Sequence, residues 1–184
     1  MPRLAPLMCF AVSSVFCLSA SAQGPQAPQT PNAAHSPAEC EVWTRELSFA
    51  RTVADHDPAA FADHVAEGAV FGAGRARQTR GREAIVARWG GIIEGRHVTI
   101  EWYPVRTTIG GLDSIAWSEG PSLLIENPGT PDAKYSLGGY RSVWHRDADG
   151  VWRVLFDDGS DSAPATPEQV QAFRAGRREA CPAG

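Results

Sequence analysis

The fold is decided by residues 133–158, AKYSLGGYRSVWHRDADGVWRVLFDD. Two long segments rich in β-branched and aromatic residues, 133–146 and 150–158, flank the turn formed by Asp-Ala-Asp-Gly. So short a link makes the two strands antiparallel neighbours. The stretch therefore predicts a pair of long antiparallel strands.

Two more segments of the same character precede this pair. They are HVTIEWYPVRTTI, residues 97–109, and DSIAWSEGPSLLIEN, residues 113–127, with Gly-Gly and Pro-Gly-Thr-Pro turns between consecutive segments. Strands of about a dozen residues exceed the usual five or six, and a sheet that long must coil. We therefore expect a curved, mainly antiparallel sheet with one concave face.

The first half of the chain supplies helices that could cover that face. Apolar residues recur at helical spacing in residues 40–57, 57–68 and 81–95, with a short strand at 69–74, and a last helix follows Thr166. Helices packed on one face of an antiparallel sheet define an α+β fold. An internal pocket follows from a curved sheet closed by helices.

The N-terminus reads as an export signal. Residues 1–22 combine Arg3, an apolar run from Leu4 to Leu18 and the small triplet Ala-Ser-Ala before Gln23. The run is shorter than the ~20 residues that span a bilayer, so a membrane helix is the weaker alternative, as is a lipid on Cys17. Residues 23–37, rich in Pro, Gln and Ala, predict a disordered linker, and residues 38–184 a single domain. We expect a periplasmic or secreted bacterial protein.

Cysteine and charge content limit the class further. The mature chain would keep Cys40 and Cys181, one at each end of the domain, which in an oxidising compartment predicts a disulfide, with two free thiols as the alternative. The net charge of −4 argues against a nucleic-acid surface. Lys134 is the sole lysine, and the other basic residues are arginines. We attribute this preference for arginine to genome composition, with an Arg-rich phosphate site as the alternative.

The order of elements, with GREAIVARW (81–89), Trp-Tyr-Pro (102–104), GGYRSVWHR (138–146) and GVWRVLFDDGS (150–160), resembles the nuclear-transport-factor-2-like superfamily. Within it, the chain looks most like the bacterial domain of unknown function 4440, which is similar to ketosteroid isomerases and polyketide cyclases. The resemblance spans roughly Glu41 to Ser160. It implies a cone-shaped α+β barrel, often dimeric through the open sheet face. This fold hosts enzymes, ligand carriers and interaction modules, so it implies no single chemistry.

The steroid isomerases of that superfamily need a carboxylate base, a tyrosine and a protonated aspartic acid. By the resemblance, the tyrosine position falls at or near Phe49, and the base position at or near Ala73. The neutral acid falls in LGGYRS, residues 137–142, which contains no carboxylate, and Val70 to Arg77 contains none either. All three roles are vacant, so we expect no ketosteroid isomerase activity.

Other polar residues offer weaker candidates. Glu119 and His64 are the remaining candidates for a base, although a solvated Glu119 and a packed His64 or His56 are the plainer interpretations. His97 and His145 lack a third ligand at metal-binding spacing. The acidic segment 157–161 is interpreted as a turn at a strand end, in preference to a calcium-binding loop. We expect no metal and no cofactor.

Aromatic residues are the strongest feature of the sheet segments. We expect the protein to bind a small, mainly apolar molecule without isomerase activity. An isomerase, cyclase or hydratase with an unfamiliar base, and a dimerisation module whose tryptophans fill the core or interface, are the alternatives. A homodimer is expected, with no nucleic acid and no membrane after signal cleavage.

Only one of Tyr140 and Arg141 can face inward. The expected pocket residues are Phe49, Val53, Phe71, Trp89, Trp102, Trp117, Tyr140 and Trp144.

Overall fold

The structure is a computed structural model that describes residues 35–182. These residues belong to one compact unit. The predicted signal peptide and residues 23–34 of the predicted linker lie outside the described residues. Residues 35–37 lead into the first helix, so the folded unit begins slightly before residue 38.

Two of the four helices begin with a capping box. In α1 (Pro37–Ala54), the Ser36 hydroxyl accepts from the Glu39 amide while the Glu39 carboxylate accepts from the Ser36 amide. In α4 (Pro167–Ala175), Thr166 has the same role, as the sequence predicts. These side chains satisfy amides that a helix leaves without partners at its N-terminus.

The other two helices are shorter or end differently. α2 (Pro58–His64) has Asp57 as its N-cap and ends before residue 68, the predicted end, because Val65 already pairs with Val154 of a neighbouring strand. α3 (Arg82–Glu94) ends at Gly95, whose φ of 67° suits a residue without a side chain.

The strands form one sheet in the order β2-β1-β7-β6-β5-β3, with β4 paired to β5 and β8 paired to β6. β1 and β7 are parallel, and the other pairs are antiparallel. The predicted α+β fold with a mainly antiparallel sheet is confirmed. The strands are β1 (Val65–Phe71), β2 (Thr79–Arg80), β3 (Val98–Trp102), β4 (Arg106–Ile109), β5 (Ile115–Glu126), β6 (Lys134–Arg146), β7 (Trp152–Gly159) and β8 (Ala163–Pro164).

The strand predicted over residues 97–109 is divided into β3 and β4. Both pair with β5, and the break at Tyr103 lies opposite Gly120. A Cβ at Gly120 would lie 2.0 Å from the Tyr103 carbonyl oxygen, so only glycine permits this close approach. The Tyr103 hydroxyl donates to the Phe173 carbonyl at 2.8 Å, which anchors α4 over the break.

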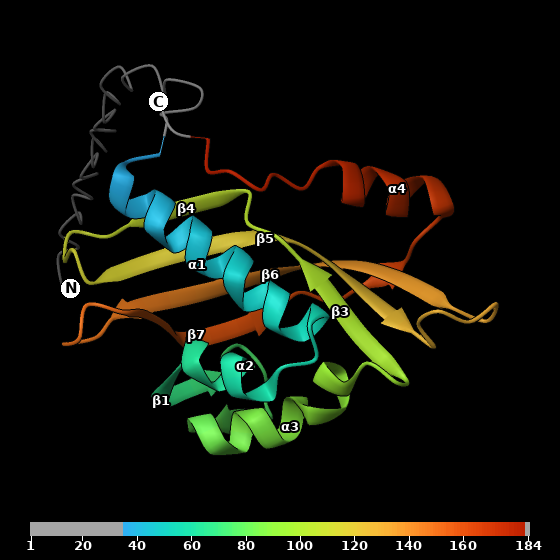
Figure 1. Ribbon diagram of the computed structural model, residues 1–184, viewed down its shortest axis with the longest axis horizontal. Helices are drawn as coiled ribbons and strands as arrows, with labels where there is room; N and C mark the ends of the chain where they lie inside the picture. The colour runs from blue at the N-terminus through green and yellow to red at the C-terminus, as the bar shows by residue number, and fades with distance from the viewer. Residues whose placement is uncertain (1–34, 183–184) are drawn as a thin grey trace, which may run out of the picture. The chain divides into compact units, whose positions relative to one another are not determined.

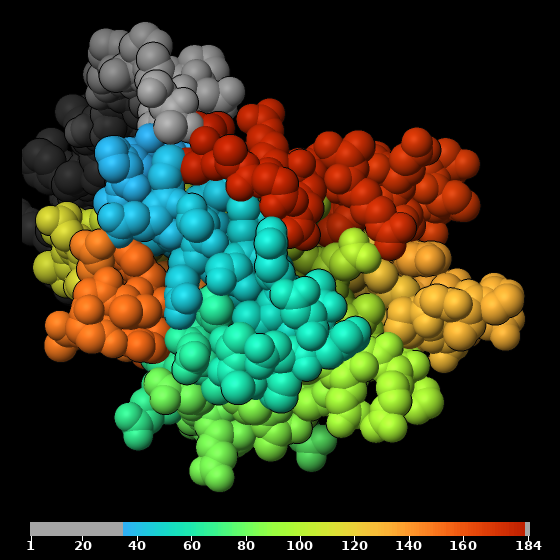
Figure 2. All heavy atoms as spheres, in the orientation of Figure 1, coloured from blue at the N-terminus to red at the C-terminus, as the bar shows by residue number. Residues whose placement is uncertain are grey.

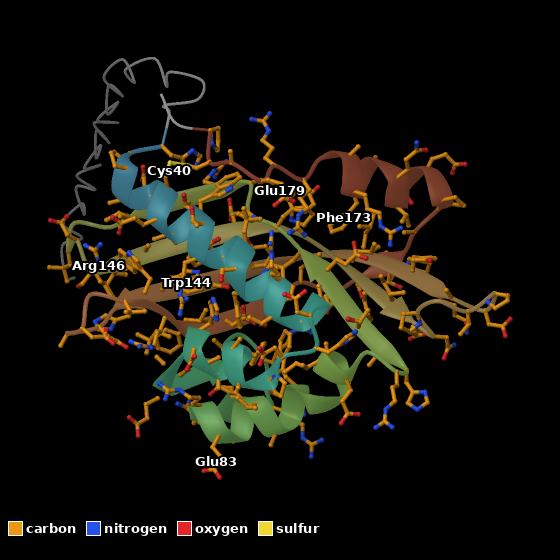
Figure 3. All side chains as sticks on the ribbon, viewed as in Figure 1. Cys40, Glu83, Trp144, Arg146, Phe173 and Glu179 are labelled. Carbon is orange, nitrogen blue, oxygen red and sulfur yellow. A yellow bond between two sulfur atoms is a disulfide. The ribbon has the colours of Figure 1, made fainter. Side chains whose placement is uncertain are left out.

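The three N-terminal helices cover one face of the sheet (Figures 1 and 2). α1 crosses the long strands, with Trp144 of β6 beneath it (Figure 3), while α2 and α3 close the end near β1 and β3. The main core lies between these layers and includes Val42, Phe49 and Phe61. No helix among residues 35–182 is long and apolar enough to cross a membrane.

A disulfide joins Cys40 to Cys181, as the sequence predicts. The bond links α1 to the segment after α4 across a sequence separation of 141 residues. Cys181 packs against a second apolar cluster, which includes Trp43 and Phe173. The C-terminal segment is thereby attached to the start of the fold.

Candidate functional site

A cavity of about 170 Å³ lies between the concave face of the sheet and the helices. Its walls come from α1, α3, β3, β5, β6 and β7, and from the segment after β7. An engineered apolar cavity of roughly 150 Å³ holds one benzene molecule, so this volume suits a ligand about the size of a single ring. The lining residues are Phe49, Trp89, Ile100, Trp102, Ser122, Leu124, Gly139, Tyr140, Asp157, Asp158, Gly159, Ser160 and Ser162.

Four aromatic side chains form the greater part of the wall. The ring of Trp102 lies 5.4 Å from that of Phe49, 6.2 Å from that of Trp89 and 6.4 Å from that of Tyr140, measured between centroids. The corresponding interplanar angles are 79°, 70° and 62°. Because Phe49, Trp89, Trp102 and Tyr140 come from α1, α3, β3 and β6, they line the cavity from different elements of the fold.

Asp157 places a carboxyl group on the same wall. Its Oδ2 accepts a hydrogen bond of 2.8 Å from the Ser142 hydroxyl. Asp157 is half-buried, and its accessible surface lies on the cavity wall. Burial raises the pKa of Asp157 to about 7. The nearby charges of Glu46 and Asp158 also raise this pKa, whereas the hydrogen bond from Ser142 lowers it. This carboxyl group can therefore gain or lose a proton near neutral pH.

A bulge in β7 turns Asp157 inward. Trp144 pairs with Val154 and the adjacent Val143 pairs with Phe156, so Leu155 is an extra residue in β7 without a partner in β6. An extra residue reverses the alternation of side chains beyond it. Phe156 consequently points out, and Asp157 faces the cavity beside Ser142.

A second carboxyl group, that of Glu46, lies in the core beside the cavity. Its two oxygens accept bonds of 2.7 Å from the Trp102 indole and 2.8 Å from the Trp144 indole. Glu46 is fully buried, and burial raises its pKa to about 7 although the indoles and the Ser118 hydroxyl bind the charged form. The carboxylate thus fixes one aromatic wall of the cavity.

Ser118 connects this buried acid to the cavity. Its hydroxyl lies 3.1 Å from the Tyr140 hydroxyl, and it acts on Glu46 by lowering the pKa of that carboxyl group. Burial, and then the charge of Glu46, raise the pKa of Tyr140 well above its usual value. Tyr140 therefore remains a neutral hydroxyl on the wall, on the same side of the sheet as Ser142.

The structure places four of the eight expected pocket residues on the cavity wall: Phe49, Trp89, Trp102 and Tyr140. Trp117 lies on the opposite side of the sheet, because it pairs with Val143, which is three positions from Tyr140 along β6, an odd number that turns its side chain to the other face. The remaining expected residues, Val53, Phe71 and Trp144, are buried in the core around the cavity without lining it.

The two candidate bases lie outside the cavity. Glu119 faces outward, where it pairs with Arg106 at 3.2 Å and accepts from the Trp117 indole at 3.2 Å. His64 is buried, and its two nitrogens lie 2.7 Å from the Ala60 carbonyl and 3.0 Å from the Ser48 hydroxyl. Burial lowers the pKa of His64 to about 4, so it packs as a neutral ring.

Two of the other histidines considered in the sequence have structural contacts, and a third is exposed. His56 bonds the Ile93 carbonyl at 2.6 Å, His145 bonds Asp147 at 2.8 Å, and His97 is exposed. The acidic segment 157–161 is divided between the cavity and a surface cluster, in which Arg75 binds Asp158 and Asp161. Residues 35–182 contain no group of three or more ligands that could hold a metal ion.

The positions expected to be vacant lack the steroid isomerase groups, but neighbouring strands supply similar ones. Phe49 is part of the aromatic wall, and Ala73 lies at the end of β1. A tyrosine reaches the cavity from β6 as Tyr140, and a carboxyl group reaches it from β7 as Asp157. Residues 157–161 were expected to form a turn at a strand end, whereas Asp157 lies within β7 and lines the cavity.

Glu46 was also missed, although the sequence carries a clue to it. Counting along α1 from Val42, residues 46, 49 and 53 follow at spacings of four, three and four, the apolar stripe of the helix. A glutamate in that stripe must be buried. Its partners, Trp102 and Trp144, come from distant strands and could not be identified from spacing.

No family model matches the chain, and no curated protein matches its sequence. Solved structures do match its fold. A ketosteroid isomerase-like protein from Erwinia carotovora atroseptica aligns with a TM-score of 0.57 and 14% identity, over 72% of this chain and 100% of that one. A protein from Novosphingobium aromaticivorans, provisionally named scytalone dehydratase, gives 0.56 and 14%, over 78% and 91%.

A further structure is described as a nuclear-transport-factor-2-like protein with a cystatin-like fold, also from Novosphingobium aromaticivorans. It aligns with a TM-score of 0.52 and 20% identity, over 73% of this chain and 85% of that one. Likeness at such identities concerns the backbone and leaves the chemistry open. The chain has the nuclear-transport-factor-2-like α+β cone fold.

Proposed function

We propose that the protein binds a small, mainly apolar molecule of about one ring in size within the cavity. The observation that carries this proposal is a partly open cavity lined by four aromatic side chains and one accessible carboxyl group. Ligand pockets combine apolar walls with a few placed polar groups in this way. The tryptophans leave this space open, which weakens the alternative of a dimerisation module without a ligand.

The experiment is native mass spectrometry of protein purified from its own host's exported fraction. A bound small molecule that is lost on denaturation supports the proposal. Recovery of the bare chain alone, together with failure to bind any one-ring compound at millimolar concentration, contradicts it.

Proton transfer is the second candidate function, and Asp157 is the observation that favours it. A catalytic base works best when its pKa lies near the working pH, and the pKa of Asp157 is about 7. The Tyr140 hydroxyl on the same wall could donate to an oxygen of the substrate. An isomerase, cyclase or hydratase would use such a pair, with Asp157 in place of Glu119 or His64.

This candidate is tested by following exchange of the α-protons of cyclopentanone in D₂O by NMR. The wild-type protein should accelerate exchange, and Asp157→Asn should lose about 10²- to 10⁴-fold of that rate. Equal rates in both proteins would remove proton transfer by Asp157 and leave a binding protein.

We also propose that the protein is exported and that its signal is cleaved before Gln23. Within the superfamily, we propose that the chain belongs with the domain of unknown function 4440. The Cys40–Cys181 disulfide supports an oxidising compartment. Intact mass of the exported protein tests cleavage, since an N-terminus other than Gln23 or a lipid on Cys17 would contradict it.

A homodimer through the outer face of the sheet is proposed as well. Trp117, Val143 and Phe156 lie side by side on three strands of that face, and the two aromatic side chains are 37% and 42% exposed. A two-fold axis at Val143 would place Trp117 of each copy over Phe156 of the other. Such a self-complementary row suits an isologous interface.

A further inference from the structure

The charged groups on the cavity wall are all acidic. Among the described residues, the lining contains Asp157 and Asp158 but no lysine, arginine or histidine. Asp158 is engaged by the Arg75 guanidinium outside the lining, at 3.4 Å. The charge available to a ligand in the cavity is therefore that of Asp157.

One oxygen of Asp157 is free for a ligand. Oδ2 accepts from Ser142, whereas Oδ1 accepts no hydrogen bond from any residue in the described part of the chain. A carboxylate with an open acceptor favours a ligand that brings a donor, and most of all one that also brings positive charge. Glu46, behind the aromatic wall, adds negative charge to the same region.

The aromatic walls favour the same kind of ligand. Ring faces attract cations, and enclosures of several aromatic rings recognise ammonium groups. Phe49, Trp89, Trp102 and Tyr140 all line this cavity, and the Trp102 ring stands at 62° to 79° to the other three, so a ligand in the cavity can contact several rings at once. An aromatic enclosure with a carboxylate but no basic residue differs from a simply apolar pocket.

We propose that the cavity selects small organic cations, namely ammonium compounds with an apolar body of about one ring in size. This inference rests on the proposed small-molecule function of the same cavity. The Asp157 carboxylate pairs with the cationic group, and the aromatic rings enclose the apolar body. A neutral molecule of equal shape gains the enclosure but not the charge pairing.

The test compares choline with its neutral carbon isostere, 3,3-dimethylbutan-1-ol, in titrations followed by ligand-observed NMR. Wild-type protein should bind choline at least about tenfold more tightly at pH 8, as expected for one desolvated charge contact. Asp157→Asn should lose that preference while keeping the affinity for the alcohol. Asp132→Asn, the same change at an exposed turn, should behave as wild type.

The pH dependence of the wild-type protein provides a test that needs no variant. Choline does not titrate, so a change in its affinity reports the protein. The groups acting on Asp157 are Glu46 of α1, Ser142 of β6 and Asp158 of β7, and Asp157 in turn acts on Tyr140 of β6. Protonation of Asp157 with a pKa of about 7 should weaken choline binding about tenfold between pH 8 and pH 6, and leave the alcohol unaffected.

Each outcome has a distinct meaning. Equal affinity for choline and the alcohol, or tighter binding of the alcohol, overturns the inference while the proposed binding function stands. Binding of neither compound contradicts the binding function and the inference together. A choline preference that Asp157→Asn retains would show that the charge selectivity arises elsewhere.

Discussion

The backbone amide of Ala73 donates to the carbonyl oxygen of Asp157 at 3.1 Å. The resemblance to steroid isomerases places their base at or near Ala73, which carries no carboxyl group. The residue beside it on the neighbouring strand supplies a carboxyl group to the cavity instead. The carboxyl group of this site therefore comes from a different strand than the base of a steroid isomerase. Its position relative to a ligand must differ accordingly.

We predict no isomerisation of Δ5-3-ketosteroids above background. The resemblance to steroid isomerases places their base at or near Ala73 and their tyrosine at or near Phe49, and neither residue can perform that role. Loss of a positioned base typically costs about 10²- to 10⁴-fold in rate. The check is a spectrophotometric assay of 5-androstene-3,17-dione, and clear turnover that Asp157→Asn abolishes would disprove this prediction.

The pH dependence of the free energy of unfolding should reflect the titration of the Glu46 carboxyl group. Its pKa is raised from 4.5 to about 7 on folding, so the folded state holds the proton more tightly than the unfolded state. The free energy of unfolding of wild type should therefore fall as pH rises from about 4.5 to 7, by at most roughly 3 kcal/mol from this residue. Glu46→Gln cannot titrate and should show a flatter curve.

Urea unfolding at pH 5 and pH 7.5 measures this difference. Glu83→Gln makes the same change on the exposed side of α3 (Figure 3) and should keep the wild-type slope. Parallel curves for wild type and Glu46→Gln would show that Glu46 titrates normally in the folded state.

Reduction of the disulfide should lower the melting temperature. Cys40 and Cys181 close a loop with a sequence separation of 141 residues, which in the chain-entropy model stabilises the fold by up to roughly 5 kcal/mol. Thermal unfolding with and without dithiothreitol, beside the double variant Cys40→Ser, Cys181→Ser, provides the measurement. Unchanged melting in both comparisons would contradict a stabilising bond.

The proposed dimer predicts the effect of a charge on the outer face. Trp117→Arg should convert a dimer into a monomer at micromolar concentration, because two copies would bury like charges near the two-fold axis. Leu112→Arg, at a more exposed residue outside the Trp117–Val143–Phe156 row, should leave the dimer intact. Analytical ultracentrifugation decides between these outcomes, and a monomeric wild-type protein would rule the interface out.

Much of the fold could be predicted because its elements carry local signals. Proline at the first turn with a Thr166 cap marks α4, and turns rich in glycine and aspartate separate the long strands. The break between β3 and β4 was missed although Pro104 marks it locally, since a proline cannot donate to a strand ladder, while the approach of Tyr103 to Gly120 is visible only in the structure. Local pattern cannot show a contact between distant segments.

The site was less predictable for a related reason. Strand alternation places Trp152, Val154 and Phe156 on one side, which would turn Asp157 outward. The bulge at Leu155 reverses this arrangement, and it is visible only in the pairing with β6. By contrast, Phe49 and Tyr140 line the cavity, as aromatic residues on the covered concave face of a sheet can be expected to do.

The central claim, that a small molecule binds in the cavity, is tested most directly by filling the cavity. Leu124 lines it, so Leu124→Trp should occupy the space, whereas Leu112→Trp adds the same side chain on the surface. Binding of 4-fluorobenzyl alcohol is followed by ¹⁹F NMR of the ligand. We predict saturable binding to wild type and Leu112→Trp, and a loss of at least about tenfold in Leu124→Trp, because the added ring removes the space a ligand needs. Equal binding to all three proteins, or none to wild type, would contradict the account.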